Sequence, residues 1–127
     1  MKIKLCSVPV DSQDNAQAFY TGVLGFEVKN DIPIGEHRWL TVVSPDAPDE
    51  VELLLEPTEF PAAKTYQSAL LEAGIPWTGF AVSDVRAEYA RLVEQGVVFT
   101  GEPVDAGGTT IVVFHDTCGN LIQLYQV

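Results

Sequence analysis

The sequence predicts an α+β fold in which one βαβββ module occurs twice. Residues 114–125 have the pattern strand, tight turn, strand, because Asp, Gly and Asn favour turns and β-forming residues flank them. A strand followed by a helix pattern that ends at glycine also occurs twice, from Val10 to Gly25 and, at nearly the same spacing, from Val82 to Gly96. The chain of 127 residues, 46% of them hydrophobic, is long enough to bury a core.

The first module begins with a strand at residues 3–10, where alternation places Cys6, Val8 and Val10 on one face as candidate core. Residues 11–14 offer helix caps, and Gly25 favours the left-handed conformation that follows a helix. Between them lies the expected helix, with an apolar stripe of Ala16, Phe19, Tyr20, Val23 and Leu24.

Three more strands complete the first module, residues 1–57, because turn-forming segments separate three β-forming runs. The expected strands are residues 26–31, 37–44 and 51–56, and the breakers are residues 33–35 and 45–49. A linker at residues 58–74 follows. It holds a short helix with Ala63, Tyr66, Leu70 and Leu71 near helical spacing.

The second module, residues 75–127, repeats the plan with a strand at residues 77–82, a helix cap at Ser83 or Asp84, and a helix that ends at Gly96. The remaining strands are expected at residues 97–100, 109–115 and 121–127. Neither module could cover both faces of its own sheet, so a single domain over residues 1–127 is expected.

Composition excludes several classes of partner. Eighteen acidic and seven basic residues give a net charge of −11, which repels nucleic acid and anionic lipid surfaces. No apolar run is long enough to span a membrane, and the first residues lack a signal-peptide pattern, so a cytoplasmic location is expected. The two cysteines, Cys6 and Cys118, are expected to be reduced thiols.

Two motifs resemble the vicinal oxygen chelate superfamily, which includes glyoxalase I, the extradiol dioxygenases and the bleomycin resistance proteins. They are the helix exit at residues 18–26 and the turn Asp116-Thr117-Cys118-Gly119-Asn120 with the strand after it. The resemblance implies curved mixed sheets around a cavity and, as in many members, a homodimer. In the metal-dependent members a divalent ion is held by inward residues, chiefly His and Glu, on the first and last strand of each module.

The metal-binding pattern mostly fails when it is carried over residue by residue. The first-strand position falls on Leu5 in module one and at or next to Trp77 in module two, and neither side chain ligates metal. The last-strand position of module two falls on Gln123, and that of module one lies among Glu52, Leu54 and Glu56. No cofactor is therefore expected, and a divalent metal, if bound, would use Gln123 and either Glu52 or Glu56.

Strand parity selects the candidate site residues. Val51, Leu53 and Leu55 form an apolar row that should face the helices, as do Ile122 and Leu124. The opposite face then carries two candidate catalytic carboxylates, Glu52 and Glu56. It also carries the candidate ligand-binding residues Leu5, Ser7, Trp39, Trp77, Gly79, Gln123 and Tyr125. Such a mixed surface suits an organic ligand better than an ion.

Three functions remain open from the sequence. The first is a metal-independent protein that binds a small molecule, cationic or aromatic, as in the bleomycin resistance branch. The second is a metal-dependent lyase or isomerase that resembles glyoxalase. The third is a cofactor-free enzyme in which Glu52 or Glu56 moves a proton while the two tryptophans hold the substrate. His37 and His115, both expected at strand ends, are weaker candidates for a base or a metal ligand.

Overall fold

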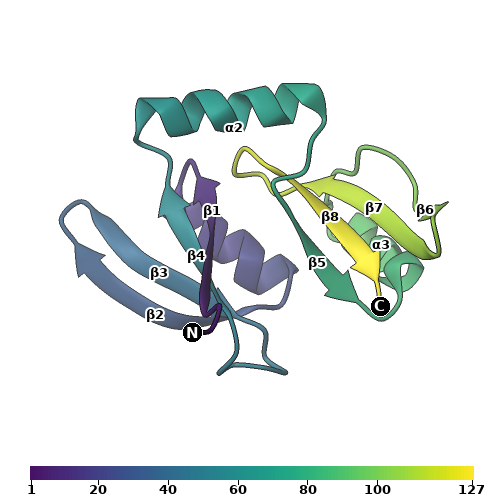
Figure 1. Ribbon diagram of the computed structural model, residues 1–127, viewed down its shortest axis with the longest axis horizontal. Coiled ribbons are helices and arrows are strands. Elements are labelled where there is room, and N and C mark those ends of the chain that lie inside the picture. The colour runs from purple at the N-terminus through teal and green to yellow at the C-terminus, as the bar shows by residue number, and fades with distance from the viewer. The chain divides into compact units, whose positions relative to one another are not determined.

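The computed structural model describes residues 1–127, and the chain divides into two compact units, residues 1–65 and 66–127. Each unit holds one four-stranded mixed sheet (Figure 1). In both sheets the first strand of the unit pairs in parallel with its last strand, and the other pairs are antiparallel. The expected α+β fold with two βαβββ modules is therefore confirmed.

Unit 1 is a sheet with helical segments on one face. Its elements are β1 (Leu5–Val10), α1 (Gln13–Gln17), the π-helix η1 (Ala18–Val23), β2 (Glu27–Ile34), β3 (His37–Val43) and β4 (Glu52–Pro57). The strand order is β1-β4-β3-β2, so β2 is an edge strand. The core lies between the sheet and these helical segments. It includes Val8, Val10, Leu40 and Leu55, all fully buried.

The first helix is where the stripe predicted it, but its second half is a π-helix rather than an α-helix. The hydroxyl of Ser12 caps the start by accepting from the amide of Asn15 at 3.2 Å. Further along, the hydroxyl of Thr21 donates to the carbonyl of Gln17 at 2.6 Å, and so competes for the acceptor that an α-helix would use. The wider π turn follows.

Strand β2 contains one extra residue. Glu27 and Val28 pair with Val43 and Val42, but Asn30 pairs with Thr41, so Lys29 is left over as a β-bulge. Because side chains along a strand alternate between the two faces of the sheet, the extra residue exchanges the faces of all later side chains in β2. Its later residues on the face away from the helices are Asn30, Ile32 and Ile34.

Two expectations for unit 1 are wrong. Strand β2 does not end at residue 31 but runs through Pro33 to Ile34, which the edge position permits because one side of the strand needs no hydrogen bonds. Cys6 is exposed rather than core, since burial along β1 starts only at Val8.

Unit 2 repeats the sheet with the order β5-β8-β7-β6. Its elements are β5 (Thr78–Val82), α3 (Val85–Glu94), β6 (Val104–Ala106), β7 (Thr109–His115) and β8 (Leu121–Gln126). The carboxylate of Asp84 caps α3 by accepting from the amide of Ala87 at 3.0 Å, as one of the two predicted caps. Val112, Phe114, Ile122 and Leu124 are buried on the helical side of this sheet.

The second strand of unit 2 does not lie where the sequence predicts it. Residues 97–100 make only one isolated bridge, between Phe99 and Phe114, and the strand is the short β6 instead. The hydrophobicity of this segment serves side-chain packing: the ring of Phe99 lies 4.7 Å from that of Tyr89 and 5.8 Å from that of Phe114.

Helix α2 (Pro61–Ala73) is longer than the short helix expected in the linker, and the boundary between the units lies within it. Its buried residue is Gln67, whereas Tyr66 of the predicted apolar stripe is 57% exposed. No helix of the chain has both the length and the apolar character required to cross a membrane.

Candidate functional site

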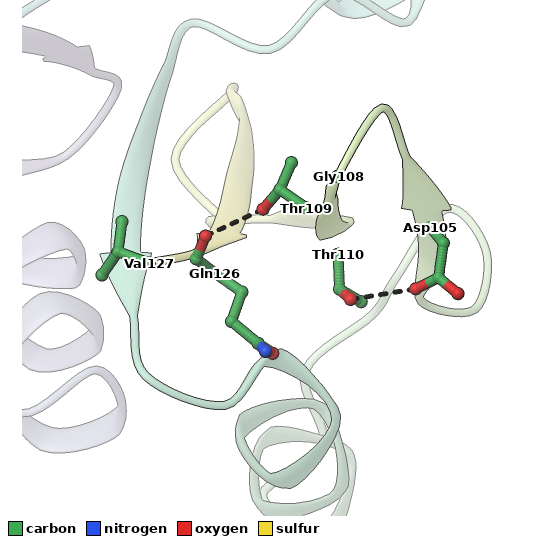
Figure 2. Close-up of a pocket in the computed structure, with 6 residues that line it drawn as sticks. All are labelled: Asp105, Gly108, Thr109, Thr110, Gln126 and Val127. Atoms are coloured by element: carbon green, nitrogen blue, oxygen red, sulfur yellow. Dashed lines mark hydrogen bonds between the residues drawn. The ribbon is translucent and has the colours of Figure 1, made fainter.

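A hollow of about 470 Å³ lies in unit 2 beside β6, β7 and the end of β8 (Figure 2). Its polar groups already bond to one another: the hydroxyl of Thr109 donates to the carbonyl of Gln126, and that of Thr110 donates to the carboxylate of Asp105. The side chain of Gln126 accepts from the amide of Val85. None of the predicted site residues lines this hollow, and we do not assign it a function.

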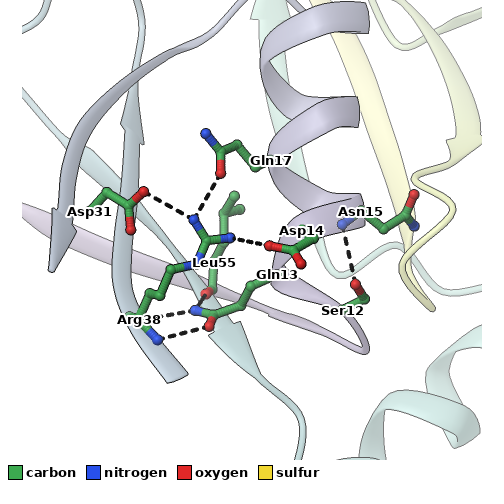
Figure 3. Close-up of polar contacts among 8 residues, drawn as sticks. All are labelled: Ser12, Gln13, Asp14, Asn15, Gln17, Asp31, Arg38 and Leu55. Carbon is green, nitrogen blue, oxygen red and sulfur yellow. Dashed lines mark hydrogen bonds and ion pairs between the residues drawn. The ribbon is translucent and has the colours of Figure 1, made fainter. Parts of the chain in front are cut away.

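The helical face of the unit 1 sheet is closed by a polar network (Figure 3). The amide side chain of Gln13 joins α1 to two strands, because Nε2 donates to the carbonyls of Arg38 at 2.7 Å and Leu55 at 2.9 Å. Oε1 of Gln13 accepts from the backbone amide of Arg38. The Arg38 guanidinium then donates to acceptors on α1 and β2, namely Gln17, Asp14 and Asp31.

We call the opposite side of this sheet the open face. The register pairs Leu5 with Glu52, Ser7 with Leu54 and Pro9 with Glu56, and paired residues share a face. Trp39 lies two residues before Thr41, which pairs with Leu54. The structure therefore brings together all five candidate residues of unit 1: Leu5, Ser7, Trp39, Glu52 and Glu56.

The Glu52 carboxylate is fixed in place on the open face. Its Oε1 accepts from the hydroxyl of Thr41 and from Nδ2 of Asn30, both at 2.8 Å. Thr41 is fully buried, and its Oγ1 in turn accepts from the backbone amide of Asn30 at 3.2 Å. The second oxygen of Glu52 accepts no hydrogen bond, and no lysine or arginine forms an ion pair with the carboxylate.

Glu56 differs from Glu52 although both lie on this face. Its side chain is exposed and has neither a hydrogen-bond nor an ion-pair partner. A solvated carboxylate of this kind has no fixed direction. Of the two carboxylates that the sequence offers, only Glu52 is held in one orientation by other side chains.

Large apolar side chains lie exposed at two places on the open face: Leu5 is paired with Glu52, whereas Ile32 and Ile34 lie further along the sheet, beside Trp39 and His37. Leu5 is 45%, Ile32 51% and Ile34 57% exposed, and Ile32 is paired with the half-buried Trp39. Sequence alternation does not predict Asn30, Ile32 and Ile34 on this face, because the β-bulge at Lys29 decides their side of the sheet. Uninterrupted alternation along β2 would have placed them against the helices.

The candidate residues of unit 2 also share one face of their sheet. Gly79 pairs with Gln123, and a Cβ on Gly79 would lie 3.3 Å from two ring atoms of Tyr125. The aromatic ring therefore occupies the space beside Gly79. Trp77 lies just before β5 and meets the ring of Tyr66 from α2 edge-on, at 5.3 Å.

These registers test the metal pattern that the family resemblance implies. In unit 1 Leu5, the expected first-strand position, pairs with Glu52. In unit 2 the residue paired with Gln123 is Gly79, and Trp77, at or next to which the first-strand position is expected, lies two residues before it. The first module thus offers one carboxylate and the second one neutral amide. A divalent cation needs more N or O donors than this. The residues present do not fit the metal of the metal-dependent members.

A separate group of possible ligands lies at the turn between β2 and β3. The ligand atoms of Glu36, His37 and Glu59 all lie within 4.8 Å of one another. His37 Nε2 is 2.8 Å from a carboxylate oxygen of Glu59, although the angles are not those of a hydrogen bond. Both glutamates are exposed, and exposed acidic groups commonly lie close together without a bound ion.

The turn between β7 and β8 is a structural element rather than a site. Asp116 is fully buried, and its Oδ1 accepts from the amides of Cys118 at 2.8 Å and Asn120 at 3.0 Å. Nε2 of Gln67 donates to the Cys118 carbonyl and to the Asn120 side chain, and so ties α2 to this turn. The turn residues hold each other in one conformation.

Comparisons with known proteins agree on the family. The family model described as the Glyoxalase/Bleomycin resistance protein/Dioxygenase superfamily matches residues 2–124. The uncharacterized protein YurT of Bacillus subtilis (strain 168) is 56% identical over 126 residues, which is 99% of each chain.

Two solved structures are similar over nearly their whole length. The crystal structure of UcmS2 has a TM-score of 0.86 and 38% identity, covering 100% of this chain and 98% of that one. TnmS3, an antibiotic binding protein from Streptomyces sp. CB03234, has a TM-score of 0.78 and 32% identity, covering 99% and 95%. The chain therefore belongs to the glyoxalase/bleomycin resistance protein/dioxygenase superfamily, the vicinal oxygen chelate group that its helix exit and terminal turn resemble.

Proposed function

We propose that this protein binds a planar, polycyclic aromatic small molecule of the antibiotic type, without a divalent metal. The observation that carries the proposal is the open face of unit 1, where Trp39 and three exposed apolar side chains share one side of the sheet with a fixed carboxylate. Large exposed apolar surface of this kind marks binding sites in soluble proteins. The similarity to TnmS3, an antibiotic binding protein, supports an antibiotic as the ligand.

The proposal also assigns ligand-binding roles to Trp77 and Tyr125 of unit 2, which lie on one side of that unit's own sheet. It also includes a single domain over the whole chain and a homodimer, as in many members of the family. Light scattering on the eluting protein would measure the mass in solution. A monomeric mass would show that the homodimer proposal is wrong, and it would not affect the ligand proposal.

Tryptophan fluorescence tests the binding function directly, because the chain has two tryptophans, one in each unit. In a Trp77→Phe variant the remaining signal comes from Trp39. We expect a panel of polycyclic aromatic antibiotics to include compounds that quench this signal saturably. The matched Trp39→Phe variant reports on Trp77 alone. If no compound changes either signal or binds by calorimetry, the proposed function is wrong.

The second candidate function is a cofactor-free enzyme with Glu52 as general base. The specific observation in its favour is the fixed orientation of this carboxylate, with one oxygen open to a substrate proton. Turnover of a bound compound that disappears in Glu52→Gln while binding persists would favour the enzyme. Unchanged recovery of every bound compound would favour the binding protein.

A further inference from the structure

Glu52 is a half-buried carboxylate whose surroundings supply hydrogen bonds but no positive charge. Both of its hydrogen bonds come from neutral groups, those of Thr41 and Asn30, and both go to Oε1. The cations of neighbouring segments are engaged elsewhere: Lys4 and Lys29 bond to the loop at Asp49, and Arg38 bonds on the helical face.

An unpaired carboxylate in partly apolar surroundings costs free energy that a cation would recover. Two hydrogen bonds and the burial of Thr41 make the open oxygen of Glu52 a directed acceptor. The Thr41 hydroxyl and the Asn30 amide prevent rotation, and buried Thr41 cannot move away. Leu5, paired with Glu52, supplies apolar contact beside the charge. A flat cation would satisfy the charge and cover the Leu5 side chain together.

We infer that Glu52 recognises a protonated nitrogen on the aromatic ligand, and that Thr41 and Asn30 are positioning residues for this contact. This inference rests on the proposed function and adds the ligand's charge. Glu56 is the competing acid on the same face, but it has no partner that directs it. Glu52 therefore determines the selectivity for a cationic ligand.

A matched pair of ring systems separates charge from shape. At mildly alkaline pH 9-aminoacridine is a cation, whereas acridine has the same three fused rings and is neutral. We expect the wild-type protein, in titration calorimetry, to bind 9-aminoacridine about tenfold more tightly than acridine, since a close charge pair shielded from water is worth roughly that factor or more.

The variants assign the preference to residues. Glu52→Gln should lower the affinity for 9-aminoacridine to about that for acridine and so remove the preference for the cation. Thr41→Val should reduce the preference about threefold, because one of the two hydrogen bonds that fix the carboxylate is lost. Thr41→Ser, which keeps the hydroxyl, should restore it. Circular dichroism and thermal unfolding of each variant identify any that fails to fold.

The outcomes distinguish the two proposals. Binding of both compounds with equal affinity, or a preference that Glu52→Gln retains, overturns the inference and leaves the proposed function in place. A preference that disappears in Glu56→Gln instead of Glu52→Gln also overturns it. If neither ring system binds, the proposed function itself fails, since it requires a face that accepts planar aromatic molecules.

Discussion

Two acidic side chains, Glu52 in unit 1 and Asp116 in unit 2, lie at the centre of hydrogen-bond networks that differ in burial and in the acceptors used. Asp116 is fully buried and uses both oxygens: Oδ1 accepts from two backbone amides, and Oδ2 from the Asn120 side chain at 2.8 Å. Glu52 is half-buried and uses only one oxygen, which accepts from two side chains.

The difference separates a structural network from one that is available for a ligand. Backbone amides inside a turn need their acceptor for the fold to exist, because an unpaired buried amide is costly. The Thr41 and Asn30 side chains could form hydrogen bonds with other acceptors, and the second oxygen of Glu52 can accept from a ligand. Substitutions at Asp116 should therefore change stability, whereas substitutions at Glu52 should change binding.

The largest effect is expected for Asp116→Ala. The change leaves the buried amides of Cys118 and Asn120 without their acceptor, so the free energy of unfolding should fall by about 3–5 kcal/mol. Urea denaturation measures the loss. Glu102→Ala, which removes an exposed carboxylate from the same unit, should stay within about 0.5 kcal/mol of wild type. Equal effects of the two substitutions would contradict the structural role.

Gly119→Ala should have an intermediate effect of about 1–3 kcal/mol. Gly119 has φ +100°, and an added Cβ would lie 2.8 Å from Nε2 of Gln67, which its hydrogen bonds to the turn hold in place. Thermal unfolding measures the change. The control is Gly101→Ala, where a Cβ meets nothing within 4 Å and φ is not positive.

A double variant sharpens this second prediction. In a Gln67→Ala background the clash is gone, and Gly119→Ala should cost less than it does in the wild type. If Gly119→Ala lowers the free energy of unfolding equally in both backgrounds, the whole effect comes from the backbone conformation and none from the contact with Gln67 of α2.

The smallest effect on stability is expected for Glu52→Gln. Glutamine keeps an oxygen that can accept from Thr41 and Asn30, and it removes a half-buried charge, so the free energy of unfolding should change by less than about 1 kcal/mol. Urea denaturation beside Asp116→Ala gives the comparison. A loss as large as that of Asp116→Ala would show that Glu52 is a structural residue.

Local chemistry made much of the fold predictable. Turn residues at 116–120, the glycines that end two helices and the alternation in β4 and β8 gave the repeated module and placed Glu52 and Gln123 opposite the apolar rows. The relation of Glu52 to Leu5 could not be read in the same way, because a parallel pairing between distant strands sets it.

What remained hidden depends on long-range packing. Cys6 follows the same alternation as Val8, yet only Val8 is covered by other elements, and no local pattern marks that limit. The apolar character of residues 97–100 reflects ring packing and not a strand. Asn30 became visible only through the pairing of β2 with β3, which sequence alternation alone does not define.

The β-bulge at Lys29 also makes the open face responsive to insertions and deletions. Loss of that one residue would restore regular alternation along β2. It would therefore exchange the side chains that the later part of this strand places on the open face. Because β2 is an edge strand with one neighbour, β1 and β4 could keep their pairing. Relatives that differ by one residue in this strand would then share a fold and differ in the compounds they accept.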